Sequence, residues 1–211
     1  MGYMNQILSS PQRLMQSDGV EMSNFQELIN SRRSIYKFTD EPVSQEIIQA
    51  ALQAASNAPS HKHTHPWKFY FLGEATRKRL IPTISKLAKV KSAKLQSTTV
   101  EADSERAIGK ITKPPLLIAV SSKKSPNDKF REKEDYAATV CALHNMVLSL
   151  WANGVGAQWS TGGITRDQET YQILSIDSST EEIIGFLKAG YPAKVRHVNK
   201  KPVDEIVAYL D

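Results

Sequence analysis

EKEDYAATVCALHNMVLSLWANG, residues 132–154, is the stretch that decides the fold of this 211-residue chain. Its large side chains recur every three or four positions, which is the period of an α-helix. They are Tyr136, Val140, Cys141, His144, Val147, Leu148 and Trp151. Asn153 and Gly154 then supply a C-terminal stop. Because these side chains cover most of the helix circumference, the pattern predicts a central helix over 132–152 that packs on several sides or lies at a subunit interface.

Shorter helix and strand patterns alternate on both sides of this central helix. Strands are predicted at 67–72, 116–120, 157–160 and 183–189. Helices are predicted at 23–34 with Ser23 as the cap, at 44–56 with a stop at Asn57, and at 167–174, and an amphipathic piece is predicted at 203–210. Residues 121–130 have the composition of a polar loop. This order favours one α+β domain over residues 23–211.

Residues 74–112 are predicted to be helical, but they carry few large apolar anchors between Leu95 and Ile108. Such a polar helical segment is a candidate for a mobile lid.

Composition and the chain ends bear on several other classes of protein. Residues 1–22 lack an export signal and are treated as an extension, and no apolar run approaches the roughly 20 residues of a spanning helix. The net charge is +5, but the basic residues are spread along the chain, which argues against a nucleic-acid protein. The single cysteine, Cys141, is expected to be a buried thiol in the central helix, which suits a cytoplasmic location.

Residues 58–69, APSHKHTHPWKF, place three histidines at alternate positions: His61, His63 and His65. Alternate residues of an extended chain point the same way, so the three could form one face of a metal site. However, the other histidines, His144 and His197, lie far off in the sequence without paired spacing. A polar surface loop and the wall of another kind of pocket therefore remain as alternatives to a metal site.

Two catalytic or binding motifs with strict spacing are missing. The chain has no G-x-S-x-G of a serine hydrolase. The stretch that begins at Gly154 starts like G-x-G-x-x-G, but its sixth position is Trp159, and it follows a helix instead of a strand.

Taken in order, the short motifs resemble the nitroreductase family of FMN-dependent oxidoreductases. The blocks that carry the resemblance are INSRRSIYKF (29–38), EPV (41–43), NAPSHKHTHPWKFYFL (57–72), GVGAQWSTG (154–162), IIGFLKAGYPA (183–193) and KKPVDEIV (200–207). The loop with Ala58-Pro59-Ser60-His61-Lys62 is most similar to the small, compact members. The resemblance implies a central mixed or antiparallel sheet flanked by helices, in a homodimer with a helical interface and two FMN molecules there.

The resemblance also implies which residues contact the cofactor. Arg32, Arg33 and Ser34 would bind the phosphate and ribityl part of FMN, and guanidinium groups suit phosphate because they are forked donors. The alternative for the two arginines is an electrostatic role at a helix end. Asn57 and His61 match positions that contact FMN from the neighbouring subunit, and Trp159, Ser160 and Thr161 match the segment beside the flavin ring. Lys200 is implied as a further cation near the phosphate.

The implied activity is a two-step, ping-pong reduction in which NADH or NADPH gives hydride to flavin N5 and a small-molecule acceptor, a nitroaromatic or quinone, is then reduced. The flavin carries this chemistry, so no catalytic side chain and no metal is expected. Two rivals remain: another flavin reaction such as dehalogenation, and a non-catalytic flavin-binding protein. Where many members have Asn and Gln, this chain has His63 and His65, which leaves the hydrogen bonding at the ring and the substrate open.

Overall fold

The computed structural model describes residues 14–15, 21–22 and 25–210. The predicted cap at Ser23 and most of the N-terminal extension lie outside the described residues. Within the extension, β1 (Leu14–Met15) pairs antiparallel with β2 (Glu21–Met22). The first helix, α1 (Phe25–Ser31), ends three residues before the predicted end at Ser34.

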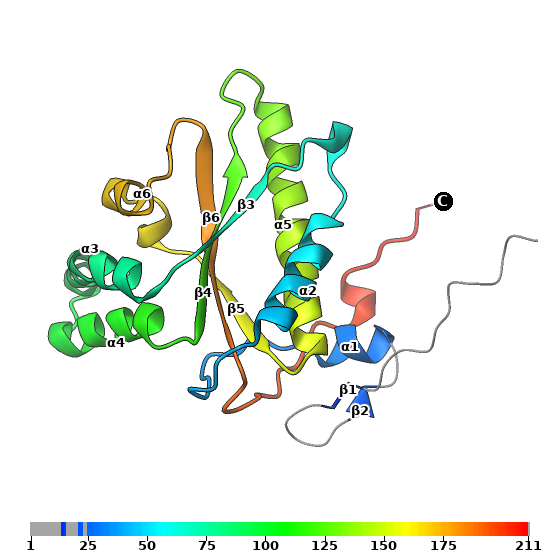
Figure 1. Cartoon of the computed structure of the whole chain (residues 1–211), viewed down its shortest axis with the longest axis horizontal. Helices are drawn as coiled ribbons and strands as arrows, with labels where there is room; N and C mark the ends of the chain where they lie inside the picture. The colour runs from blue at the N-terminus through cyan, green and yellow to red at the C-terminus, as the bar shows by residue number, and fades with distance from the viewer. Residues whose placement is uncertain (1–13, 16–20, 23–24, 211) are drawn as a thin grey trace, which may run out of the picture.

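A four-stranded sheet forms the middle layer of the molecule (Figure 1). Its strands lie in the order β3 (Trp67–Phe71), β4 (Leu116–Lys123), β6 (Glu181–Gly190) and β5 (Gly156–Ser160), and all three pairings are antiparallel. The predicted α+β class with a central sheet is confirmed, and of the two predicted sheet types the described strands form the antiparallel one.

Helices cover both faces of this sheet (Figure 1). One face is covered by α2 (Gln45–Ser56) and α5 (Lys129–Ala152), and the other by α3 (Glu74–Lys94), α4 (Val100–Thr112) and α6 (Gln168–Leu174). The residues of β4 alternate accordingly: Ile118 and Val120 belong to the core under α5, while Leu117 and Ala119 belong to the core under α3 and α4. The two apolar layers hold the sheet in place from both sides.

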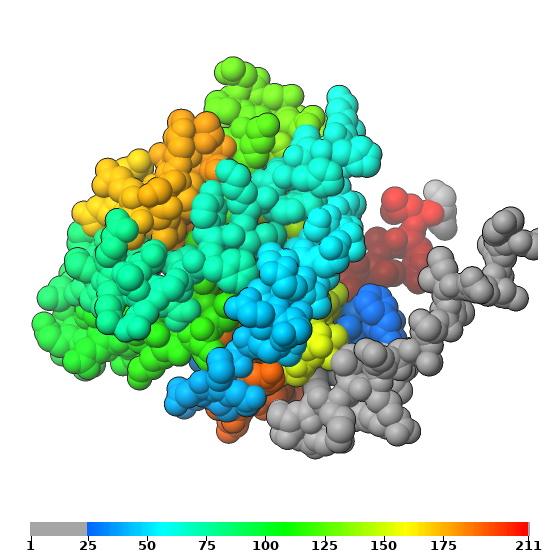
Figure 2. All heavy atoms as spheres, viewed as in Figure 1, coloured from blue at the N-terminus to red at the C-terminus, as the bar shows by residue number. Residues whose placement is uncertain are grey.

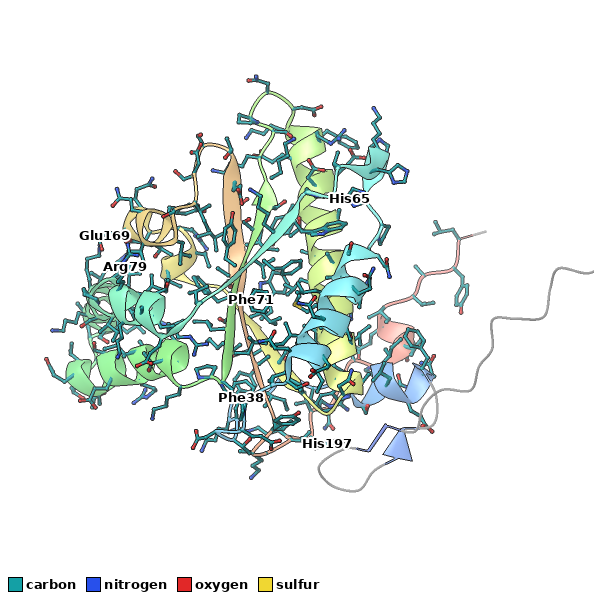
Figure 3. All side chains as sticks on the ribbon, viewed as in Figure 1. Phe38, His65, Phe71, Arg79, Glu169 and His197 are labelled. Carbon is teal, nitrogen blue, oxygen red and sulfur yellow. The ribbon has the colours of Figure 1, made fainter. Side chains whose placement is uncertain are left out.

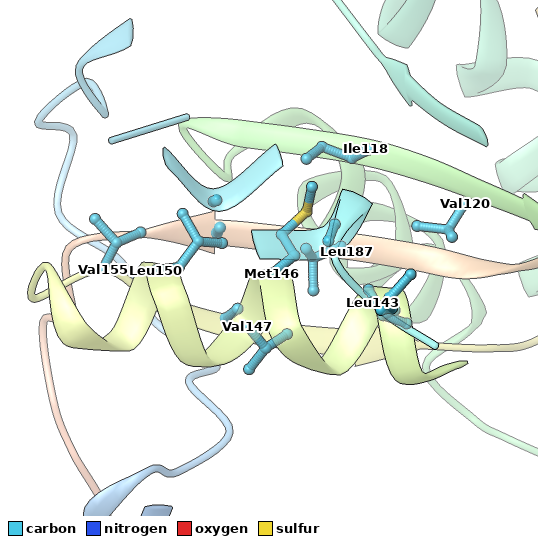
Figure 4. Close-up of a cluster of buried hydrophobic side chains, with 14 of the residues drawn as sticks. Ile118, Val120, Leu143, Met146, Val147, Leu150, Val155 and Leu187 are labelled. Atoms are coloured by element: carbon cyan, nitrogen blue, oxygen red, sulfur yellow. The ribbon is translucent and has the colours of Figure 1, made fainter. Parts of the chain in front are cut away.

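The central helix α5 is held against the sheet by its apolar stripe (Figure 4). Leu143, Met146 and Leu150 are at most 2% exposed and pack with Ile118 and Leu187 of the sheet. Burial of each such side chain stabilises the fold by roughly 1.5–3 kcal/mol. The packing of these side chains fixes α5 in position and orientation relative to the sheet.

The helix ends agree with the capping residues. The Ser44 hydroxyl accepts a hydrogen bond from Ile47 N at 3.4 Å at the start of α2, and the Asp128 carboxylate accepts one from Arg131 N at 2.9 Å at the start of α5. After α5, Gly154 has φ 74°, the left-handed conformation that glycine adopts without strain. The predicted stop at Asn153-Gly154 is confirmed.

Three predictions about elements need correction. Strand β4 runs three residues beyond its predicted end into the expected loop 121–130, because Ser121 and Ser122 are buried with hydrogen-bond partners. Cys141 is exposed in the single chain, because it lies on the side of α5 that faces away from the sheet. The piece at 203–210 forms only the short 3-10 turn η3 (Val203–Glu205), and residues 193–210 are exposed throughout.

The predicted lid segment contributes to the second core. Leu80 and Ile84 of α3 and Ile111 of α4 are at most 5% exposed and pack beneath the two helices with sheet residues. A lid role for residues 74–112 stays a prediction. Any lid movement would have to leave Leu80, Ile84 and Ile111 in the core.

Within the described residues, no helix has the length and apolar character to cross a membrane. The cytoplasmic location stays a prediction.

One polar cluster joins three strands of the sheet at one end. The Glu181 carboxylate accepts hydrogen bonds from Lys68 at 2.6 Å, from Tyr70 at 2.7 Å and from Ser121. Burial acts to raise the pKa of Glu181, but the hydrogen bonds from Lys68, Ser121 and Tyr70 hold this pKa below its ordinary value. The ionised carboxylate thus connects β3, β4 and β6.

We expect Glu181→Gln to lower the free energy of unfolding at pH 7 by on the order of 1 kcal/mol, because an amide cannot accept all three hydrogen bonds. A depressed carboxyl pKa stabilises the native state above the unfolded pKa, and this contribution is lost as the pH falls below about 4.5. Urea unfolding should therefore show a smaller difference at pH 3 than at pH 7. The exposed neighbour Glu182, changed to Gln, is the control; equal effects of the two changes would contradict the cluster's role.

Candidate functional site

A pocket of about 270 Å³ lies where α5, β5 and the segment after α1 meet, and it is partly open to solvent. Its lining combines one cation, one histidine, one hydroxyl and otherwise apolar groups. The lining residues are Arg32, Ser34, Val140, Leu143, His144, Val147, Ala157 and Trp159. Three of the predicted site residues, Arg32, Ser34 and Trp159, are thus brought together from segments more than 120 positions apart.

The segment that carries Arg32 and Ser34 is fixed by the side chain that follows it. Ile35 is 1% exposed and packs with Trp151 at the end of α5. Its backbone N–H donates to the Ala157 carbonyl at 3.0 Å, so that Ser34 and Ala157 form a parallel bridge at the edge of β5. A side chain at Gly156 would come within 2.9 Å of the Ile35 Cβ, so glycine is needed for this close approach. Arg32 therefore enters the pocket from a rigid backbone.

The two adjacent arginines differ in what they bind. The Arg33 guanidinium donates to the Asn30 carbonyl at 2.7 Å and to the Arg32 carbonyl at 2.8 Å, which is the helix-end role that the sequence left open. The Arg32 guanidinium makes no hydrogen bond or ion pair with the described residues and lines the pocket. Arg32 is therefore the guanidinium that is available to an anionic ligand.

Trp159 forms the aromatic wall of the pocket from the edge strand β5. Its indole N–H donates to the Ile184 carbonyl at 3.2 Å, and its ring lies against Gly185 of the neighbouring strand β6. The side chain is still 39% exposed. A flat aromatic surface is thus held in one orientation and left open on one side.

The α5 side of the pocket was missed as a site in the sequence, although its periodicity was visible. Val140, Leu143, His144 and Val147 follow one another at helical spacing, and together with Ala157 they supply the remaining lining. His144 is exposed in the single chain, but the partial burial of its ring and then the charge of Arg32 lower its pKa. The signal that could have found this wall is the one histidine within the apolar repeat of α5.

The other predicted site residues are outside this pocket lining. Ser160 donates to the Phe186 carbonyl at 3.2 Å, Thr161 follows β5 and is exposed, and Asn57 caps the end of α2. Lys200 lies in the exposed tail. His61 is exposed, with its Nδ1 atom 3.9 Å from Glu134. Their roles, and that of Arg33, stay predictions, and for Asn57 and His61 the predicted contact is with the partner's flavin.

The histidine loop has an uncommon backbone. Lys62, His63 and His65 have φ values of 52°, 52° and 43°, in a region that side chains other than glycine rarely adopt. The His65 ring lies edge-on to the Trp67 ring, with the two ring centroids 5.4 Å apart. Figure 3 shows His65 in the upper half of the molecule and His197 in the lower half. No three His, Cys, Asp or Glu residues in the described part of the chain are grouped to hold a metal ion.

The pocket has the chemistry to bind a ligand with an anionic end and a planar end. A guanidinium and a hydroxyl are donors for phosphate oxygens, while an indole and aliphatic side chains pack against an aromatic ring. The volume is just below the usual range of roughly 300 to 1,000 Å³ for ligand sites. A larger ligand would therefore extend out of the wall formed by this chain.

Comparisons with known proteins identify relatives of the chain. Residues 29–191 match the model of the Nitroreductase family. The protein named "Putative NAD(P)H nitroreductase YfhC" of Bacillus subtilis (strain 168) is 30% identical over 180 residues, covering 85% of this chain and 90% of the relative.

Solved structures share the fold. The nitroreductase-like family protein of Bacillus cereus has a TM-score of 0.70 and 27% identity, covering 90% of this chain and 97% of its own. A nitroreductase with bound FMN from Bacteroides fragilis NCTC 9343 has a TM-score of 0.66 and 21% identity, covering 88% and 98%. An iodotyrosine deiodinase bound to FMN and 3-iodo-L-tyrosine has a TM-score of 0.70 and 20% identity, also covering 88% and 98%.

Proposed function

The chain belongs to the nitroreductase family, and from this premise we propose that it is an oxidoreductase that binds FMN in the pocket of Arg32 and Trp159 and uses NADH or NADPH as electron donor. The observation that carries the proposal is the Arg32 guanidinium, which has no hydrogen-bond partner among the described residues and lines the same pocket as an aromatic ring. Bound FMN in two proteins of this fold supports the choice of cofactor.

The side chains that line the pocket have the chemical character that FMN binding requires. Arg32 and the Ser34 hydroxyl would hold the phosphate and ribityl end, because both are donors from a fixed backbone. Trp159 and the apolar side of α5 would pack against the ring system and exclude water from one of its faces. Bound in this way, FMN supplies hydride transfer from NAD(P)H and, in a second step, electrons for a nitroaromatic or quinone acceptor.

We also propose that the working unit is a homodimer. The pocket is smaller than the usual ligand site and partly open, so a second chain would complete its wall. The C-terminal tail, red in Figure 2, carries exposed apolar side chains that this chain does not cover: Val203, Ile206, Tyr209 and Leu210, each at least 69% exposed. Exposed apolar groups in such number indicate an interaction surface. Sedimentation of the full chain should give twice the monomer mass, and a monomer at all concentrations would contradict the dimer.

The function is tested by visible absorption of the purified protein. The two bands of oxidised flavin should be present, should fade when NADH or NADPH is added without oxygen, and should return when a quinone or nitroaromatic is added. A protein that binds FMN but shows neither change would be a binding protein without turnover. A protein that takes up no FMN would refute the proposal.

We expect Arg32→Ala to weaken FMN binding about tenfold, because it removes charge-assisted hydrogen bonds to the phosphate worth roughly 1.5 kcal/mol. Riboflavin, which lacks the phosphate, should bind both proteins alike. The matched control is Arg33→Ala, since the Arg33 guanidinium is already bound to backbone carbonyls. Equal losses of FMN affinity in both variants would show that the pocket lining does not identify the phosphate-binding arginine.

A second candidate reaction is reductive dehalogenation, because a protein of this fold is bound to FMN and 3-iodo-L-tyrosine. In this reaction two electrons from NAD(P)H and a proton replace the aryl carbon–iodine bond by carbon–hydrogen and release iodide. Iodide release from 3-iodo-L-tyrosine, compared with the reduction of a nitroaromatic, would separate the two reactions.

A further inference from the structure

His144 is a polar exception in an otherwise aliphatic wall. On α5 it stands between Val140 and Val147, each within one turn, with Leu143 beside it, and all four side chains line the pocket. Apolar residues would serve a wall that only packs against a ring. An imidazole at this position adds a group that accepts or donates hydrogen bonds according to its proton.

The pocket contains only two ionisable side chains among the described residues, Arg32 and His144. Arg32 comes from the segment after α1, β5 contributes Ala157 and Trp159, and α5 contributes His144 with three aliphatic residues. Cys141, one turn before His144, is exposed and outside the lining. No carboxylate lines the pocket, so the two groups have no counter-charge there until an anion enters.

Arg32 and His144 line the same pocket of about 270 Å³, so the guanidinium charge acts on the imidazole. The imidazole is exposed in the single chain, yet its partial burial and the charge of Arg32 lower its pKa, which favours its neutral form in the free pocket. An anion that binds Arg32 would reverse the sign of the local potential and attract a proton to His144. Binding and protonation would then favour each other reciprocally.

We infer that His144 is a proton-linked anion-binding residue of this pocket: it contacts the negatively charged group of the ligand together with Arg32 and takes up a proton as the ligand binds. The ligand, FMN, rests on the proposed function; the anion linkage does not depend on any redox activity. Since the protonated form binds best, affinity for a phosphorylated ligand should be higher at pH 6 than at pH 8, beyond the change that the ligand's own titration causes.

The first test measures release of flavin fluorescence when the purified flavin-containing protein is diluted at pH 6 and pH 8. Because the phosphate of FMN itself titrates near pH 6, the wild-type protein is compared with His144→Gln at the same pH, so that the ligand's own titration cancels. We expect the wild-type dissociation constant to change with pH about tenfold more than that of the variant, equivalent to one pKa unit. Equal pH dependence would overturn the inference.

Riboflavin is the control for the shape of the pocket. Both proteins should bind it alike and with no difference in pH dependence, because it has no phosphate. His144→Asn serves as a second variant if His144→Gln does not fold. A variant that loses riboflavin as well as FMN affinity would point to a packing role and overturn the inference.

A second measurement does not use flavin and therefore separates this inference from the proposed function. The His144 ring proton signal is followed by NMR against pH, with and without inorganic phosphate as the probe, in wild type and Arg32→Ala. A titration midpoint that rises with phosphate in the wild type, and less in the variant, supports the linkage. A midpoint that phosphate leaves unchanged contradicts it, whether or not the protein binds FMN.

Discussion

Gly185→Ala should destabilise the protein by about 3 kcal/mol and weaken ligand binding in the pocket, although Gly185 is not in the pocket lining. A methyl group at this position would overlap the Trp159 indole nitrogen and come within 3.1 Å of the Ser160 carbonyl oxygen. Gly185 follows an irregularity in the pairing of β4 with β6, and the adjacent Ile184 carbonyl accepts the indole hydrogen bond. Overpacking costs roughly 1–3 kcal/mol, and a lost hydrogen bond adds about 1 kcal/mol.

Chemical unfolding and flavin titration measure the two effects of Gly185→Ala. The matched control is Gly163→Ala, where the nearest atom to an added methyl is Leu87 at 3.5 Å, an ordinary contact. If Trp159 carries the effect, then adding Trp159→Ala to Gly185→Ala should cost less stability than the sum of the two single changes. Simple additivity would mean that the strain lies elsewhere in β6.

The elements that the sequence predicted well are those whose signals are local. Helices α2 and α5 have capping residues at their ends and an apolar period that needs no knowledge of the rest of the chain. Strand β4 was predicted too short because its last residues are polar. Ser122 is buried beside Thr139 of α5, which donates to its hydroxyl at 3.1 Å. The satisfaction of such a buried hydroxyl depends on tertiary contacts, so composition alone indicates a loop.

The exposure of Cys141 illustrates the limit of periodicity. A repeat that covers most of the circumference predicts burial on all sides, but it does not say whether the same chain or another one covers each side. In this chain the sheet covers the side with Leu143 and Met146, while Tyr136 and Cys141 are exposed. Apolar spacing in residues 203–210 likewise predicted an amphipathic element, but the spacing does not say whether this chain or another one covers its apolar side.

The residues of the candidate site also fall into a group that the sequence predicted and a group that it did not. Arg32, Ser34 and Trp159 were identified through the resemblance of short motifs, and the fold brings them together. Val140 and His144 were assigned to an apolar helix face, because nothing local distinguishes a wall that contacts a ligand from one that contacts protein. Asn57 and His61 were predicted to act on a partner subunit, and a single chain does not test that role.

Lys188→Met should stabilise the protein by on the order of 2 kcal/mol at pH 7. Lys188 is 5% exposed in β6, and its cross-strand neighbours are Leu117 and Gln158. Because Leu117 belongs to the core under α3 and α4, the lysine lies on the same face of the sheet. Among the described residues, no carboxylate lies within ion-pair distance of it. Burial, and then the charge of Lys110, lower its pKa to about 8.

The pH dependence follows from this depressed pKa. In the unfolded chain a lysine keeps its ordinary pKa near 10.4, so below pH 8 both states are protonated and the native state bears the full cost of a buried ammonium group. Between about pH 8 and pH 10.4 the unfolded state binds more protons, so stability rises with pH and the cost disappears. Methionine has a similar length and no charge. The variant therefore has neither the destabilisation by a buried ammonium group below pH 8 nor the rise in stability between about pH 8 and pH 10.4.

The measurement is the difference in free energy of unfolding between wild type and Lys188→Met, determined with urea at pH 7, 9 and 10. The difference should favour the variant at pH 7 and shrink toward pH 10, while other titrating groups cancel because both proteins share them. Lys110→Gln is the control; it removes only the neighbouring charge and should stabilise by at most about 0.5 kcal/mol. A variant no more stable than wild type at pH 7 would mean that the Lys188 ammonium group is solvated in the native state, and the buried charge would then have no part in the stability of this sheet.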